Sequence, residues 1–447
     1  MPMRLSLAER TLAAGAGPDR YIADSARRLT LVQAALALDA GAFAGRNVLI
    51  RTKGQLPTVL ALLALDGIAR RILLCPADIG DAQIPEIMAT GEVEITLTDA
   101  ELAAPLRQAA RAAASSGALP HLDTEWILFT SGTSGFPKLV QHSLQSLIAP
   151  IADGPAGTNP VWSTFYDIRR YGGLQILLRA LLTGGSMVLS EADEPVAAFL
   201  QRLGAHKVSH VSGTPSHWRR VLMSGAAEII APSYVRLSGE ISDQPILDRL
   251  GKTYADAKIA HAFASTEAGV VFGVTDSRAG FPPAILQPDP SRPEIRIEDG
   301  TLRIRSNCTA TRYLGTAKRL AKDAQGFVDT GDMVELRDGR YYFCGRREGV
   351  VNVGGEKIYP EEVEAVINLH PRVSMSRVWA RKSPITGTLI AADIVLTPTT
   401  GEDDFDRLRG EILERCRLEL RPHKVPVLLK RVSEIAMMTS GKIERRA

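Results

Sequence analysis

The chain has 447 residues, of which 45% are hydrophobic and 23% charged, as in a soluble globular protein large enough for more than one domain. With 53 Lys and Arg against 50 Asp and Glu, the net charge of +3 is too small to indicate a nucleic-acid or anionic-membrane partner. The 4 cysteines lack metal-site or redox spacing and no apolar run reaches membrane-spanning length, so we expect a cytoplasmic protein without a membrane partner.

Strands and helices alternate along the first half of the chain. Residues 1–45 are rich in alanine and predict mostly helix. The segments that follow predict strands at 48–50, 72–74, 92–97, 126–129, 186–189 and 208–211, and helices at 57–69, 100–114, 174–182, 196–203 and 215–223. This order is typical of βαβ units and predicts an α/β fold with a largely parallel sheet.

The segment from Phe129 to Lys138 combines glycines, hydroxyl side chains and one lysine directly after a buried strand. Glycines let backbone N–H groups approach an anion, hydroxyls add donors, and Lys138 adds a positive charge. The segment predicts a polyphosphate-binding loop that lacks the common P-loop spacing, and an ordinary Gly/Ser surface turn is the alternative. The candidate ligands are Thr130, Ser131, Gly132, Thr133, Ser134, Gly135 and Lys138.

The last third of the chain changes character. Residues 293–343 contain short strand patterns with hairpin signals at Asp299-Gly300 and Asp338-Gly339, which predict a small β-rich unit. Strand patterns at 373–380 and 389–396 and a helical pattern at 403–418 then predict a compact α/β unit.

The segment from Phe129 to Lys138 resembles the phosphate loop of the adenylate-forming superfamily, which includes acyl-CoA synthetases, firefly luciferase and nonribosomal peptide adenylation domains. Further motifs follow in the family's order to the C-terminus. The resemblance implies a large N-terminal domain of parallel-rich βαβ sheets at 1–347, with a small β-barrel-like subdomain at about 290–345. It also implies a small mobile α/β lid domain at 348–447.

Three motifs resemble the family's nucleotide site. Segment 235–240 resembles a turn against the adenine, with Gly239 and Glu240 as candidates and a strand-end turn as the alternative. The segment from Phe263 to Glu267 resembles an aromatic-Gly-x-Thr-Glu motif, although Ala264 replaces the glycine. By resemblance Phe263 stacks on adenine, Thr266 binds the α-phosphate and Glu267 binds Mg²⁺. Taken alone, Thr-Glu is also a common start of a helix.

The remaining motifs resemble the family's ribose, hinge and lid segments. By resemblance Asp332 binds the ribose hydroxyls, Arg346 contacts the nucleotide and Glu348 is the interdomain hinge. Gly354 and Gly355 are implied to lie beside the pantetheine arm of coenzyme A. Pro360, Glu361 and Glu362 read simply as a helix N-terminus.

Residues 439–445 resemble the family's terminal motif, in which Lys442 reaches the active site during adenylation. Two positions depart from the family pattern, where Ala436 replaces a proline and Met438 a threonine. The implied catalytic residues are therefore Lys442, Thr266 and Glu267.

The resemblance implies an ATP-dependent, Mg²⁺-requiring ligase that joins a small carboxylic acid to CoA through an acyl-adenylate. Its acid pocket is expected at Arg170, Tyr171, Gly172 and Ser212. A pocket-facing Arg170 would favour an aryl or a short polar or dicarboxylic acid, whereas arginines that face solvent or pair with Asp167 would not.

Two other functions stay open. One is an adenylation enzyme that loads an amino or aryl acid onto a carrier protein, although the Gly-Gly-Glu and Pro-x-Glu motifs look more like those of CoA ligases. The other is a degenerate nucleotide-binding protein without catalysis, which only Ala264, Ala436 and Met438 favour.

Overall fold

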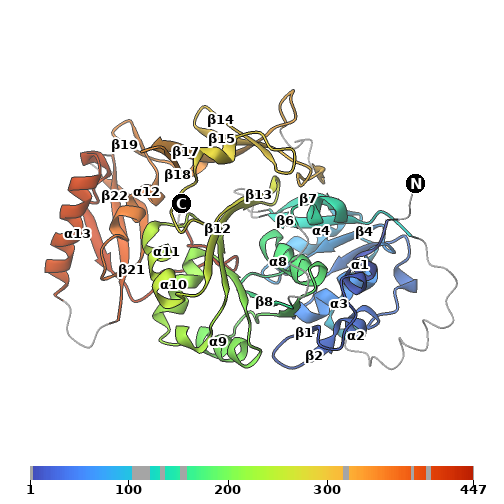
Figure 1. Cartoon of the computed structure of the whole chain (residues 1–447). Coiled ribbons are helices and arrows are strands. Elements are labelled where there is room, and N and C mark those ends of the chain that lie inside the picture. The colour runs from blue at the N-terminus through green and yellow to red at the C-terminus, as the bar shows by residue number, and fades with distance from the viewer. Residues whose placement is uncertain are drawn as a thin grey trace.

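The structure is a computed structural model that describes residues 4–102, 121–130, 136–151, 159–315, 322–383, 387–398 and 404–445. Its strands form two large sheets, a smaller antiparallel sheet and a separate C-terminal unit (Figure 1). None of the helices within these ranges has the length and apolar character needed to cross a bilayer.

The first large sheet has eight strands, which run in the spatial order β13 (Gly269–Val274), β12 (Lys258–Ser265), β11 (Tyr234–Ser238), β10 (His210–Gly213), β8 (Val161–Thr164), β9 (Ser186–Val188), β1 (Tyr21–Ala23) and β2 (Arg28–Thr30). All pairings from β12 to β1 are parallel, and the two edge strands pair antiparallel.

The second large sheet has six strands, which run in the order β16 (Arg312–Tyr313), β7 (Lys138–Ser143), β6 (Glu125–Thr130), β4 (Arg71–Leu74), β3 (Asn47–Ile50) and β5 (Ile95–Leu97). The four strands from β6 to β5 are parallel, whereas β7 and β16 are antiparallel. The predicted α/β class with parallel-rich sheets is confirmed.

The helices lie between and around these sheets. They are α1 (Leu7–Ala13), α2 (Leu31–Ala35), α3 (Gln55–Leu65), α4 (Ile84–Gly91), α5 (Asp99–Leu102), α7 (Leu144–Ile148), α8 (Tyr171–Leu182), α9 (Val196–Ala205), α10 (Pro215–Met223) and α11 (Gln244–Thr253). Leu62 of α3 and Leu177 of α8 share one fully buried core with Val48 of β3 and Met187 of β9. Because this core joins the two sheets, α3 and α8 are buried on nearly every side.

The N-terminal segment differs from the prediction of mostly helix. Within residues 4–45 the helices are α1, α2 and a short 3₁₀ turn at Gly41–Phe43, and β1 and β2 form an antiparallel hairpin at the edge of the eight-stranded sheet. Ile22 is fully buried and pairs with Met187 of β9. The tertiary pairing of β1 thus outweighs the helix propensity of an alanine-rich segment.

The β-rich unit predicted at 293–343 is an antiparallel sheet in the order β14 (Glu294–Glu298), β15 (Thr301–Arg305), β17 (Val328–Arg337) and β18 (Arg340–Arg346). It packs on β13 through a shared aromatic and aliphatic core.

The C-terminal unit is built from β19 (Val351–Val353), β20 (Glu356–Ile358), α12 (Pro360–Ile367), β21 (Val373–Ser383), β22 (Gly387–Leu396), α13 (Phe405–Glu419) and β23 (Leu428–Arg431). It has a hydrophobic core of its own and lies beside α10 and α11 (Figure 1). Arg219 of α10 donates to the Ser374 carbonyl at 3.0 Å, and Asn368 donates to Asp243 at 2.9 Å. After β23 the chain returns to the eight-stranded sheet.

Candidate active site

Several of the predicted site residues gather at the carboxyl ends of β11 and β12, two neighbouring parallel strands. This is the edge where open α/β sheets bind ligands. Lys442 comes from the far end of the chain to this edge, where a Cβ built on Gly239 would lie 3.5 Å from its Cε. Gly239 has a φ of 87°, so its left-handed turn directly after β11 favours glycine.

Backbone contacts hold the Lys442 segment in place. The Thr214 hydroxyl donates to the Gly441 carbonyl at 2.5 Å, and the Ile443 N–H donates to Glu240 Oε1 at 2.9 Å. Glu240 Oε2 also accepts from the Ser216 N–H at 3.0 Å, at the start of α10. Glu240, predicted to lie against an adenine, is therefore also an anchor for the segment that carries the lysine.

Charged groups of both signs surround the Lys442 ammonium. The side chain keeps solvent contact, yet protein groups lie close enough that desolvation lowers its pKa. The negative charges of Glu240 and Asp332 raise the pKa of Lys442, and the positive charge of Arg346 lowers it. Burial raises the pKa of Asp332, against the effect of Arg346 and Lys442. The structure thus brings Lys442, Glu240, Asp332 and Arg346 together.

Thr266 and Glu267 directly follow β12 and lie between the eight-stranded sheet and β7. Tyr313 donates its hydroxyl to Glu267 Oε1 at 3.2 Å, and the ammonium of Lys138 lies 5.6 Å from the Tyr313 ring centroid. The Thr266 carbonyl accepts from His142 Nε2 at 2.8 Å. Tyr313 and His142 were not among the predicted site residues, because neither belongs to a motif and their partners are 46 and 124 residues away.

The phosphate-loop prediction lies only partly within the described residues. Ser131, Gly132, Thr133, Ser134 and Gly135 fall outside them. Thr130 ends β6 and pairs with Lys138 of β7, so the two strands hold the ends of the loop side by side. The buried Thr130 hydroxyl has no hydrogen-bond partner among the described residues, which suits a position that would donate to a phosphate oxygen.

Phe263 lies near the end of β12 in an aromatic cluster. Its ring stacks on Phe343 at 5.1 Å and on Phe272 at 5.8 Å between centroids. These contacts alone account for an aromatic residue at this position, and stacking on adenine stays a prediction.

The predicted hinge and pantetheine residues lie on the surface. Glu348 is exposed in a short 3₁₀ turn (Arg347–Gly349) between β18 and β19. Gly354 and Gly355 form the turn of the β19–β20 hairpin with φ values of 58° and 90°, which a two-residue hairpin turn requires. Their roles as hinge and pantetheine contacts stay predictions. Pro360 begins α12, with Glu361 and Glu362 in its first turn, as expected.

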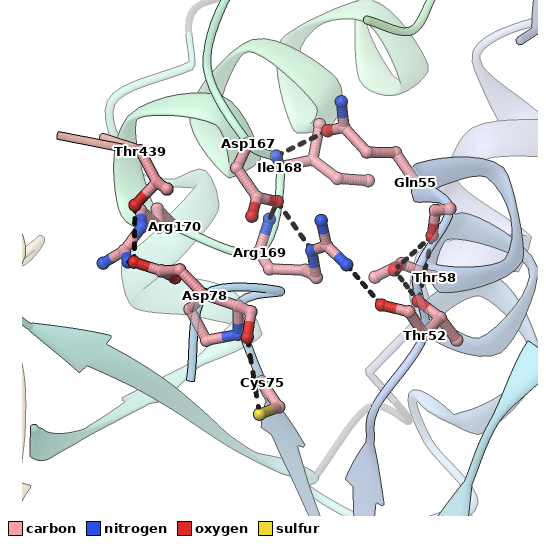
Figure 2. Close-up of polar contacts among 12 residues, drawn as sticks. Thr52, Gln55, Thr58, Cys75, Asp78, Asp167, Ile168, Arg169, Arg170 and Thr439 are labelled. Atoms are coloured by element: carbon pink, nitrogen blue, oxygen red, sulfur yellow. Dashed lines mark hydrogen bonds and ion pairs between the residues drawn. The ribbon is translucent and has the colours of Figure 1, made fainter. Parts of the chain in front are cut away.

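A cavity of about 20 Å³ adjoins this edge of the sheet, and two of the residues expected in the acid pocket, Tyr171 and Gly172, line it. Ser212 and Arg170 are not among its lining residues. Arg170 Nη2 instead donates to both carboxylate oxygens of Asp78 at 2.6 Å, as Figure 2 shows. The hydroxyl of Thr439 donates to the same carboxylate.

The neighbouring Arg169 is also paired away from the cavity. Its Nε donates to Asp167 at 2.7 Å and its Nη1 to the Thr52 carbonyl (Figure 2). The sequence left open that one of these arginines pairs with Asp167. In the structure that arginine is Arg169, whereas Arg170 pairs with Asp78. Because its guanidinium is bound to Asp78, Arg170 does not support a polar or dicarboxylic acid in this geometry.

The acidic groups at the site suit one kind of metal ion. The described residues contain no group of three or more His, Cys, Asp and Glu side chains that could bind a metal by themselves. Glu267 offers a single carboxylate near the ends of the phosphate loop. This fits Mg²⁺, which is commonly held by one or two carboxylates together with substrate phosphates.

Two family models match the chain. The model described as AMP-binding enzyme matches residues 26–314, and the model described as AMP-binding enzyme C-terminal domain matches residues 362–442. The human mitochondrial acyl-coenzyme A synthetase ACSM1 is 28% identical over 353 residues, which are 73% of this chain and 61% of that protein. An acetyl-coenzyme A synthetase of Emericella nidulans is 26% identical, over 72% of this chain and 53% of its own length. The chain thus spans about three fifths of such relatives.

Solved structures of similar fold cover nearly the whole chain. The anthranilate CoA ligase AuaEII in complex with anthranoyl-AMP superposes with a TM-score of 0.81 and 16% identity, over 99% of this chain and 96% of that one. A benzoate CoA ligase from Burkholderia xenovorans gives a TM-score of 0.76 and 18% identity, over 99% of both chains. At this identity the likeness shows the fold: a large N-terminal and a small C-terminal domain.

Proposed function

The chain belongs to the AMP-binding enzyme family, and from this premise we propose that it is an ATP-dependent carboxylic acid–CoA ligase of the AMP-forming type. The observation that carries the proposal is the position of Lys442, which lies among Glu240, Asp332 and Arg346 at the carboxyl end of β11. The residues on both sides of Lys442 are anchored by hydrogen bonds, from the Thr214 hydroxyl to the Gly441 carbonyl and from the Ile443 N–H to Glu240.

In the first half-reaction the acid's carboxylate oxygen attacks the α-phosphorus of ATP, and the bond to the departing pyrophosphate breaks. Two anions must meet, so cations and hydrogen-bond donors are needed to offset their repulsion. We assign Lys442 and Thr266 to the α-phosphate, and Thr130, Lys138 and the loop between them to the β- and γ-phosphates. Mg²⁺ held by Glu267 would neutralise phosphate charge.

The nucleoside end of ATP would be held by groups on three elements. We propose that Asp332 of β17 accepts from the ribose hydroxyls, since a carboxylate offers two acceptor oxygens to a vicinal diol. Arg346 of β18 lies opposite Asp332 of β17 in the register of the two strands. The Arg346 guanidinium donates to the Thr330 carbonyl at 3.2 Å. We assign it to the nucleotide, and Gly239 and Phe263 to the adenine.

In the second half-reaction the thiol of CoA would attack the acyl carbon, giving a thioester, AMP and a proton. We propose that the lid, residues 348–447, then turns about Glu348 and exchanges the Lys442 face for that of Gly354 and Gly355. The described conformation, with Lys442 docked, would serve the first half-reaction.

Product analysis by mass spectrometry tests the proposal. The protein is incubated with ATP, Mg²⁺ and a panel of aryl, dicarboxylic, fatty and amino acids, with and without CoA, and pyrophosphate exchange is followed in parallel. We expect AMP, pyrophosphate and the CoA thioester of one class of acid. Acyl-adenylate that accumulates and leaves CoA unmodified would point to a carrier-protein acceptor instead. Failure of every acid to support exchange would overturn the proposal in favour of a non-catalytic nucleotide-binding protein.

A further inference from the structure

One face of α8 lines the cavity beside the proposed active site. Gly172, Gln175, Ile176 and Arg179 follow one another at helical spacing and all border the cavity. Gly172 is at the start of the helix, and Arg179 lies about 10 Å further along it at 1.5 Å per residue. The face therefore leads from the edge of the sheet into the protein and ends in a positive charge.

A second arginine borders the same cavity from the sheet. Arg236 and Ser238 both line it, as expected for residues two apart on β11, whose side chains share one face. Ser238 directly precedes Gly239, the residue beside Lys442. Arg236 lies about 7 Å further back along the strand, at about 3.3 Å per residue. The two arginines thus flank the end of the cavity remote from Lys442.

Unlike Arg169 and Arg170, Arg179 and Arg236 have no acidic partner among the described residues. Arg179 donates only weakly to the Pro150 carbonyl at 3.4 Å, and Arg236 lies 3.4 Å from the Tyr234 hydroxyl. Among the described residues neither forms an ion pair with a carboxylate, whereas Arg169 and Arg170 both do. Burial lowers the pKa of Arg179, and together with the nearby charge of Arg236 it brings that pKa to about 10.

Two positive charges held close together at a cavity wall repel each other, which is unfavourable unless an anion binds between them. We infer that the cavity takes an acid with a second anionic group, whose distal carboxylate is bound by Arg179 and Arg236 while the first is activated beside Lys442. The inference rests on the proposed function and names its substrate class. The lengths along α8 and β11 suit carboxylates about 6 to 10 Å apart. Because the cavity has a volume of only about 20 Å³, lining side chains must move to admit the acid.

The test compares acids that differ only in the distal charge: terephthalate against benzoate, and adipate against hexanoate. The ratio of kcat/KM values for each pair is measured by pyrophosphate exchange in wild type, Arg236→Met, Arg179→Met and Arg236→Lys. We expect wild type to prefer the dicarboxylate by about tenfold or more, and the Met variants to lose that preference, since a charged hydrogen-bonded pair contributes this much. Arg236→Lys should keep part of it. Arg170→Met is the matched control, and its ratio should equal that of wild type.

Thermal unfolding with terephthalate alone supplies a measurement that does not need catalysis. Terephthalate should raise the melting temperature of wild type and not that of Arg236→Met. Without ligand, Arg236→Met should melt no lower than wild type, because it removes a repulsion; a purely structural arginine would show a loss.

The possible failures are distinguishable. If wild type activates benzoate and hexanoate as well as their dicarboxylate partners, or better, the inference is overturned and the proposed function stands. If no acid is activated, the proposed function fails and the thermal measurement decides alone. Stabilisation by terephthalate that Arg236→Met abolishes then supports an anion site, and its absence overturns one.

Discussion

Glu240 and Ile443, 203 residues apart in the sequence, are joined by a hydrogen bond of 2.9 Å from the Ile443 N–H to the Glu240 carboxylate. Because the same carboxylate accepts from the Ser216 N–H, it links the end of β11, the start of α10 and the residue after Lys442. The position of Lys442 is therefore set by hydrogen bonds between the backbone of its neighbours and the large domain, and not by contacts of its own side chain.

Lys442→Ala should separate the two half-reactions. We expect pyrophosphate exchange to fall by about 10² to 10³, because a preorganised charge at the site of transferring charge contributes this much. Thioester formation from added acyl-adenylate should change little. Lys430→Ala, an exposed lysine in the same unit, is the control and should match wild type in both assays. Equal loss in both half-reactions would contradict the assigned role.

Gly441→Ala should prevent the docking of the lysine segment. A Cβ on Gly441 would lie 1.8 Å from Cε1 of His217, and its φ of 74° disfavours any other residue. We expect a loss of pyrophosphate exchange close to that of Lys442→Ala, with the C-terminal unit still folded.

The double variant Gly441→Ala, His217→Ala removes the clash and should recover part of the activity. Gly410→Ala is the matched control, since a Cβ there meets no atom within 4 Å. Full activity of Gly441→Ala would show that the docked conformation is not needed for adenylation.

Thr439→Val should weaken the docking of the segment that carries Lys442 while keeping the size and shape of the side chain. The Thr439 hydroxyl donates to Asp78, which Arg170 also contacts (Figure 2). Loss of one hydrogen bond to a charged group costs about 1.5 to 3 kcal/mol at most, so we expect exchange to slow by roughly tenfold. Ser440→Ala is the control, because the Ser440 hydroxyl has no partner among the described residues. Equal rates for the two variants would contradict a role for Asp78.

Acid should destabilise the protein partly through His142. Burial lowers the pKa of His142 from 6.5 to about 4, although its hydrogen bond to the Thr266 carbonyl opposes the shift. Since the unfolded chain takes up this proton first, stability is complete above about pH 6.5 and is lost as the pH falls toward about 4.

His142→Gln keeps a donor for the Thr266 carbonyl and removes the titration. The free energy of unfolding, measured in urea, should therefore depend less steeply on pH by up to about 1.4 kcal/mol per pH unit between about pH 6 and 4.5. An unchanged slope would mean that His142 is protonated in the folded protein.

Much of the fold could be predicted from local patterns. The apolar run at 126–129 and the helical pattern at 174–182 appear in the structure as parts of β6 and α8. Residues 1–45 were predicted as mostly helix, yet residues 21–23 and 28–30 form strands, because β1 gains its stability from β9, which lies more than 160 residues away. Local propensity carries no information about such a partner.

By itself, the sequence determined the α/β class and the chemistry of the motifs, because hydrophobic periodicity and residue types are local properties. Only the tertiary structure decided which charges meet. Arg170 and Arg236 are equally basic in the sequence, yet one pairs with Asp78 and the other borders the cavity without an acidic partner among the described residues. The energy of a charge depends on burial and on neighbours within a few ångströms, and these neighbours come from distant parts of the chain.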